Sequence, residues 1–131
     1  MLHSRMKRVN EEYQHHLAEI FAWEMNDPRM KLVTPVSVKV SPDLSEAVVL
    51  ISVMEDDTTK AEEVLHVIEG ARGYIKKLMA GRIQLKRQPN PHFKLDTTLT
   101  KAFGVFKLLH EIEESGELKP ESEEIDEQKK N

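Results

Sequence analysis

Positive charge is concentrated between Gly70 and Leu95, a stretch without aspartate or glutamate in a chain whose net charge is −4. The cations of this stretch are Arg72, Lys76, Lys77, Arg82, Lys86, Arg87 and Lys94. Lysines and arginines grouped in this way neutralise phosphates and release their counterions. The chemistry that they could perform is therefore the binding of a polyanion, with nucleic acid as the first partner class. The alternative is a solvated helix face that has no partner.

A glycine-containing bend stands at the start of this basic stretch. Apolar residues at helical spacing precede and follow Gly70-Ala71-Arg72-Gly73, so two helices should meet there. A helix N-terminus after a tight turn offers backbone amides and the positive end of a dipole to a phosphate. Arg72, Lys76 and Lys77 would flank that spot, on the side away from the apolar positions. The alternative is a bend that only lets two helices pack closely.

Residue patterns for catalysis or metal binding are sparse. The chain has no cysteine, no glycine-rich phosphate loop, no nucleophile elbow and no His-Glu-x-x-His motif. His15 and His16 are adjacent and so cannot share a helix face as two metal ligands would, and residues 55–57 lack the donor pattern of a calcium site. We expect no catalytic residue, metal, cofactor or small-molecule substrate. A nuclease stays open as an alternative, although His92 is the one candidate that residues 70–95 offer.

The acidity of the chain comes from its C-terminal end. From Glu111 onward nine acidic residues oppose three lysines, a local charge of −6, so the total of −4 leaves residues 1–110 at +2. Few large aliphatic residues lie beyond Leu118, and we expect residues 117–131 to form an acidic disordered tail after a single domain over residues 1–116. This tail could simply solvate the chain, or it could compete with a polyanion for the basic stretch.

The sequence also bears on the compartment. No apolar segment of signal-peptide length follows Met1, and no stretch approaches the roughly 20 apolar residues of a membrane span. The absence of cysteine agrees with a reducing environment. We expect a cytoplasmic protein without membrane contact.

The periodicity of apolar residues predicts seven elements that position the basic stretch. Helices are expected over residues 5–25, from a capping box at Thr59–Glu62 to the bend, from the bend to about Gly81, and over residues 98–114. Strands are expected over residues 31–40, 47–54 and 91–96, and residues 82–87 alternate well enough to be strand as well.

These elements predict an α+β fold of two layers, in which helices cover one face of a three-stranded sheet. The first two strands should pair as a hairpin across the turn at residues 41–45. Prolines beside the last strand favour a place at the sheet edge. Trp23 and the methionines are expected to fill the core.

Five motifs in combination resemble those of the ribosome-binding factor A family. They are Arg8-Val9-Asn10-Glu11-Glu12, Asp27-Pro28-Arg29, Val40-Ser41-Pro42-Asp43-Leu44-Ser45, Ala71-Arg72-Gly73-Tyr74-Ile75 and Phe93-Lys94-Leu95-Asp96. The resemblance spans residues 5 to about 114. It implies a type II KH-like fold, ordered α-β-β-α-(kink)-α-β plus a C-terminal helix. The helix kink at Ala71 and Gly73 would replace the Gly-x-x-G loop that clamps RNA in other KH domains.

The resemblance also implies a function. Proteins of this family are non-catalytic assembly factors that bind the small (30S) ribosomal subunit late in maturation, support processing of the 5′ end of 16S rRNA and matter for growth in the cold. We expect a monomer whose partners are the small subunit and 16S rRNA. A KH-type protein that binds another structured RNA is the alternative.

Charge and resemblance together select the candidate RNA-binding residues. The first group is Arg72, Lys76, Lys77, Arg82, Lys86 and Arg87, and a possible second patch is Arg5, Lys7 and Arg8. Such contacts position a protein on sugar-phosphate backbone without reading sequence. Tyr74, His92 and Phe93 are the nearby side chains that could stack on a base.

Overall fold

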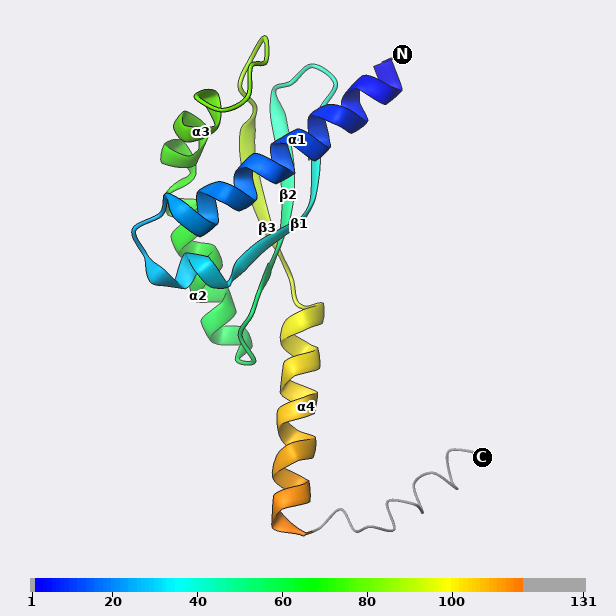
Figure 1. Cartoon of the computed structure of the whole chain (residues 1–131), viewed down its shortest axis with the longest axis vertical. Coiled ribbons are helices and arrows are strands. Elements are labelled where there is room, and N and C mark those ends of the chain that lie inside the picture. Colours follow the sequence, from blue (N-terminus) through cyan, green and yellow to red (C-terminus); the bar gives the residue numbers. More distant parts are fainter. Residues whose placement is uncertain (1, 117–131) are drawn as a thin grey trace.

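The computed structural model describes residues 2–116 (Figure 1). The expected acidic tail, residues 117–131, lies outside the described residues. The elements in chain order are α1 (Leu2–Trp23), the 3₁₀ helix η1 (Pro28–Leu32), β1 (Val33–Val40), β2 (Glu46–Val53), α2 (Thr58–Gly70), α3 (Arg72–Ala80), β3 (Asn90–Asp96) and α4 (Thr98–Ser115).

The three strands form one mixed sheet in the order β1-β2-β3. β1 and β2 pair antiparallel from Val33 opposite Val53 to Val40 opposite Ala47, with an irregularity between Pro35 and Ser37. β3 pairs parallel with β2, because the α2–α3 pair carries the chain back to the same end of the sheet. β3 therefore lies at an edge, as its prolines predict.

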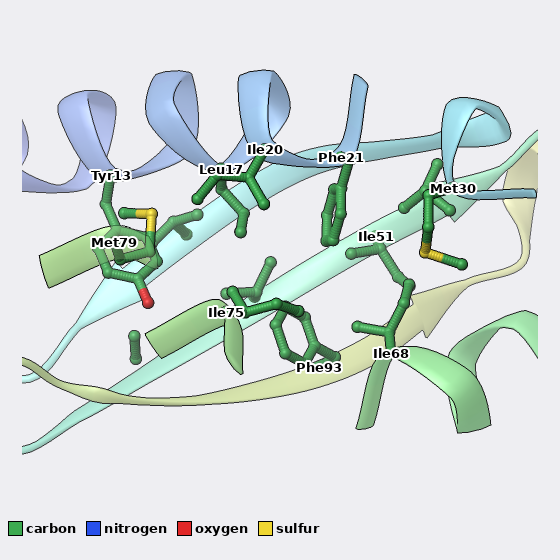
Figure 2. Packing of buried hydrophobic residues seen from close by; sticks show 14 of the residues in the cluster. Tyr13, Leu17, Ile20, Phe21, Met30, Ile51, Ile68, Ile75, Met79 and Phe93 are labelled. Carbon is green, nitrogen blue, oxygen red and sulfur yellow. The ribbon is translucent and has the colours of Figure 1, made fainter. Parts of the chain in front are cut away.

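Helices α1, α2 and α3 cover one face of the sheet, and the core lies between the two layers. Alternate residues of β2 from Ala47 to Val53 are fully buried. Figure 2 shows Tyr13, Leu17, Ile20 and Phe21 of α1 above this face, with Ile68, Ile75 and Met79 of α2 and α3 beside them. The two-layer α+β architecture expected from the sequence is confirmed.

Side chains of α1 close the outer edge of β1. The Asn10 side chain accepts a hydrogen bond from the Val40 amide at 2.9 Å, and the Gln14 side chain donates to the Pro35 carbonyl at 2.9 Å. An exposed strand edge presents unpaired backbone groups that favour association with other chains. Asn10 and Gln14 satisfy two of these groups within the fold.

Three local expectations from the sequence are wrong. Asp57, rather than Thr59, caps α2, because its carboxylate accepts the Thr59 amide at 2.9 Å and the helix begins at Thr58. Residues 82–87 form a loop, since the sheet ends with β3 and offers them no strand to pair with. Trp23 is 78% exposed, because α1 ends there beyond the turns that face the sheet.

Helix α4 projects away from the other elements in Figure 1. Its first turn is anchored by buried Thr100, whose hydroxyl donates to the Val53 carbonyl at 3.4 Å. Lys107 pairs with Asp56 at 3.1 Å. Val105, Phe106, Leu108 and Leu109 remain 44–65% exposed. These apolar side chains of α4 are thus largely uncovered by the described residues.

Candidate nucleic-acid interface

The bend between α2 and α3 is a one-residue kink. The Ala71 amide donates to the carbonyls of Val67 and Ile68 at 3.1 and 3.0 Å, and the Ala71 carbonyl accepts the Ile75 amide at 2.9 Å. Hydrogen bonding thus continues through Ala71, as in a kinked helix pair and unlike an open loop with several free amides. The structure confirms a kink at this position.

The glycines of this bend have no role inside the fold. Neither Gly70 nor Gly73 has a positive φ, and a Cβ built on either would meet no atom within 4 Å. Glycine in a helical segment costs about 0.5–1 kcal/mol relative to alanine. Bare backbone is therefore exposed on both sides of Ala71.

A basic surface extends from α3 to the edge of the sheet. Lys76 Nζ donates to Asn90 Oδ1 at 2.7 Å, and an Arg72 guanidinium nitrogen lies 3.4 Å from His92 Nδ1, so both side chains lean toward β3. Lys77 and Lys94 are exposed. We call Arg72, Lys76, Lys77 and Lys94 the α3–β3 basic surface.

Glu69 orients this surface from the last turn of α2. One carboxylate oxygen accepts the Phe93 amide at 2.9 Å, and the other lies 3.5 Å from Arg72 Nη1. The carboxylate therefore satisfies the backbone amide of Phe93 in β3 and holds the Arg72 side chain near the strand. Because Arg72 is 42% exposed, its guanidinium remains accessible to a further anion.

The prediction that Arg82 binds RNA requires a correction, because its guanidinium forms ion pairs with two carboxylates of the same chain. Its guanidinium donates to Glu19 Oε1 at 2.6 Å and to the Glu24 carboxylate, and so ties the end of α3 to α1. The hydrogen bond that Arg82 donates to Glu24, the largest cause, and the one that it donates to Glu19 raise the pKa of Arg82. Arg82 is thus an internal link and not a free cation of the surface.

The remaining cations of the basic stretch lie at the end of the molecule where β1 turns into β2. Lys86 and Arg87 lie on the loop after α3, and one Arg87 nitrogen is 3.4 Å from the Asp43 carbonyl. Arg5 of α1 lines the same hollow as these two residues. Among the described residues, neither Arg5 nor Lys86 forms an ion pair within the chain. Lys7 and Arg8 are exposed on the first turns of α1.

The turn between β1 and β2 is held rigidly by its own side chains. Asp43 Oδ1 accepts from the Ser41 hydroxyl at 2.7 Å and from the Ser45 hydroxyl and amide at 2.8 and 3.1 Å. These bonds, with the nearby Arg87 charge, lower the pKa of Asp43 to about 2. Leu44 has a φ of 63°, a conformation that costs a residue with a side chain roughly 1 kcal/mol or more.

The three candidates for base stacking differ in accessibility. Tyr74 is 51% exposed. His92 is partly exposed, with its Nε2 hydrogen-bonded to the Glu46 carboxylate. Phe93 is 5% exposed and packs against Phe21 at a ring-centroid distance of 6.2 Å, so the expectation that it could stack on a base is wrong. Strand alternation turns Phe93 into the core, and its neighbours His92 and Lys94 to the opposite face.

Among residues 2–116, no three His, Asp or Glu side chains are grouped so that they could hold a metal ion. In the same range, no helix combines the length and the apolar character needed to cross a membrane.

Sequence reasoning missed two features of this region. Glu69 reads as an acidic residue beside a basic patch, and only the parallel placement of β3 reveals its hydrogen bond to Phe93. The hollow beside Leu44 joins α1, the turn and the loop after α3, which are far apart in the chain. The Ser-x-Asp-x-Ser spacing was a signal for a rigid turn, since such side chains bond to backbone two residues on.

The architecture defines the class: an α-β-β-α-(kink)-α-β domain with sheet order β1-β2-β3 and a C-terminal helix is KH-like, of type II. The family model described as "Ribosome-binding factor A" matches residues 5–109. The chain belongs to the ribosome-binding factor A family.

Named relatives and solved structures agree. The chain is 34% identical over 109 residues to ribosome-binding factor A of Shewanella loihica, covering 83% of this chain and 78% of the relative. It is 37% identical over 119 residues to that of Desulforamulus reducens, covering 91% and 98%. The crystal structure of ribosome-binding factor A from Thermus thermophilus superposes with a TM-score of 0.58 at 26% identity, covering 69% of this chain and 94% of that one.

A further structure with the same fold comes from a complex. It is a homology model of the Thermus thermophilus factor fitted into a cryo-electron-microscopy map of a 30S complex, with a TM-score of 0.55 at 24% identity. It covers 66% of this chain and 90% of that one. At this identity it supports the fold.

Proposed function

We propose that this protein is a ribosome assembly factor that binds the small (30S) ribosomal subunit and acts without catalysis. In this proposal it engages 16S rRNA during late maturation and supports processing of the 5′ end of that RNA, as a cytoplasmic monomer. The main support for the small subunit as the target is the family match over residues 5–109. The Thermus thermophilus relative fitted into a map of a 30S complex supports the same target.

The RNA-facing side is proposed to be the α3–β3 basic surface and the kink beside it. Two features support this choice. Its cations, Arg72, Lys76, Lys77 and Lys94, come from two elements that the fold brings together. The kink carries two glycines that nothing inside the fold requires, which leaves room for sugar-phosphate backbone to approach.

Arg5, Lys7, Arg8, Lys86 and Arg87 would extend the contact around the hairpin end, whereas Arg82 is left out because Glu19 and Glu24 hold it. Contacts of this type fix the position of a protein on RNA and carry little sequence information. Selectivity would come from the shape of a folded RNA and from its sugar hydroxyls.

The test is co-sedimentation of the purified protein with small subunits. The double substitution Lys76→Glu and Lys77→Glu should abolish association while the thermal midpoint barely moves, because these side chains lie outside the core. The matched control, Lys60→Glu with Lys101→Glu, makes the same change of charge at exposed positions on α2 and α4 and should leave association intact. Equal binding by both double variants would rule out the α3–β3 basic surface.

The alternative target, another structured RNA, is separated by a second measurement. Retention on small subunits is compared with retention on free structured RNA of equal length. Our proposal predicts a clear preference for subunits. Equal retention on both would favour a general KH-type RNA binder.

A further inference from the structure

The rigid Ser-Pro-Asp-Leu-Ser turn forms one wall of a groove that lies among the cations proposed above to extend the RNA contact. The groove has a volume of about 270 Å³ and is bounded by α1, the turn and the loop after α3. Its lining residues are Arg5, Met6, Val9, Pro42, Leu44, Gln84, Leu85 and Lys86. We call it the hairpin-end groove. Figure 1 shows the N-terminal part of α1, the β1–β2 turn and the loop before β3 at the same end of the molecule.

The groove combines an apolar floor with a cationic rim. Met6, Val9, Leu44 and Leu85 are partly buried against the core and leave part of their surface toward the groove. Arg5 and Lys86 stand at the rim, and Arg87 joins them around the adjoining hollow beside Pro42 and Asp43. The Asp43 carboxylate lines the same hollow, and its single negative charge leaves these three cations and Asp43 with a net charge of +2.

We propose that the hairpin-end groove holds one unpaired nucleotide of the bound RNA. Its base would lie on the four apolar side chains, and the phosphates on either side would contact Arg5, Lys86 and Arg87. An unpaired base offers apolar faces between two anionic groups, which is the complement of this surface. The proposal rests on RNA being the partner, as inferred above, and adds a second contact point to the α3–β3 basic surface.

The volume and the strained turn favour this occupant. The groove, at about 270 Å³, is near the lower end of the roughly 300–1,000 Å³ typical of ligand pockets, so it has room for a single base. Leu44 reaches the groove from a left-handed backbone position that the bonds of Ser41, Asp43 and Ser45 enforce. Such conformations persist where the surroundings over-determine them, often at ligand-binding positions.

The test is a titration of the full chain, labelled at its methyl groups, with nucleoside 5′-monophosphates in an NMR experiment. Inorganic phosphate and the free nucleosides are the matched controls. We expect the methyl signals of Met6, Val9, Leu44 and Leu85 to shift with nucleotide, less with nucleoside and not with phosphate. No methyl response to any nucleotide would overturn the proposal. A response to a short apolar peptide carboxylate alone would assign the groove to a protein and would overturn it as well.

Two variants test whether the groove contributes to binding of the small subunit. Leu44→Gly removes the side chain at a position whose φ favours glycine, and it should lower affinity for small subunits roughly five- to tenfold while the chain stays folded. Lys86→Gln, an exposed change, should lower affinity as well. Because the wider RNA contact also includes Lys86, the NMR titration decides the matter if Leu44→Gly does not fold. Unchanged affinity in the folded variants would overturn the groove but not the proposed function. Failure of the unaltered protein to bind subunits would instead overturn the proposed function.

Discussion

We expect a substitution at Gly73 to change stability and subunit binding in opposite directions. A Cβ at this position would meet nothing in the chain. Gly73→Ala should therefore raise the free energy of unfolding by about 0.5–1 kcal/mol, through helix propensity alone. The same methyl group would stand between the kink and an approaching RNA, so affinity for small subunits should fall. Urea unfolding and co-sedimentation measure the two effects, and undiminished affinity would show that bare backbone is not needed there.

A substitution at Arg82 is expected to lower stability without changing subunit binding. Its ion pairs with Glu19 and Glu24 are partly exposed to solvent, and such pairs contribute about 0.2–1 kcal/mol each. Arg82→Ala should lower the free energy of unfolding by roughly 1 kcal/mol and leave subunit affinity unchanged at temperatures where the variant is folded. Loss of affinity without loss of stability would return Arg82 to the RNA-binding set.

Asp43 links the turn to pH. Its pKa is lowered to about 2 in the folded chain, below its ordinary value of 3.8, by hydrogen bonds from Ser41 and Ser45. The unfolded chain therefore binds more protons between these values, and stability from Asp43 is present above about pH 4 and is lost as pH falls toward 2. Asp43→Asn should lower the urea midpoint at pH 7, and this difference should shrink toward pH 2.5. A difference that is constant with pH would show that Asp43 does not titrate in this way.

At the scale of residues, sequence reasoning found the cations but not their partners. Lys76 and Lys77 could be assigned to an outward helix face because the period of Ile75 and Met79 sets that face. The commitment of Arg82 to α1 could not be seen, because Glu19 and Glu24 lie about 60 positions earlier in the chain. Contacts of that range depend on how α1 crosses the sheet, which no local pattern encodes.

At the scale of elements, α4 is the one described helix that packs against little of the rest of the fold. Short helices are marginal in water without packing, and most helical stability in proteins comes from a buried face. Thr100 anchors the first turn, whereas Phe106 and Leu109 are 65% and 44% exposed. Amides of residues 105–115 should therefore exchange with solvent much faster than those in the middle of α1, in a hydrogen-exchange experiment. Equal protection of α4 and α1 would mean that something covers α4 in solution.

Regular elements were predictable where their period was long and their ends were marked. The last helix follows from its apolar period, and the turn before β2 follows from Ser41 to Ser45. The 3₁₀ helix η1 was missed because five residues are too few to show a period, although Pro28 and the Asp27 side chain define its start. Residues 82–87 look like a strand locally, but the sheet has no further strand beside them.

At the scale of the whole molecule, the fold gathers most of the basic stretch into two regions. The α3–β3 basic surface and the hairpin-end groove are built from α1, the β1–β2 turn, α3, β3 and the loop between the last two. Helix α4 extends away from the rest of the molecule (Figure 1). The molecule therefore has a local surface suited to a polyanion although its net charge is −4.

The most direct measurement is the dissociation constant for small subunits over a series of salt concentrations. If about four to six phosphates are engaged, log affinity should fall with log salt by roughly 0.7–0.9 per contact. The Lys76→Glu and Lys77→Glu double variant should show a shallower slope as well as weaker binding, whereas the Lys60→Glu and Lys101→Glu control should match the unaltered protein. Affinity that stays constant across the salt series, or equal slopes for all three proteins, would contradict docking through the basic surface.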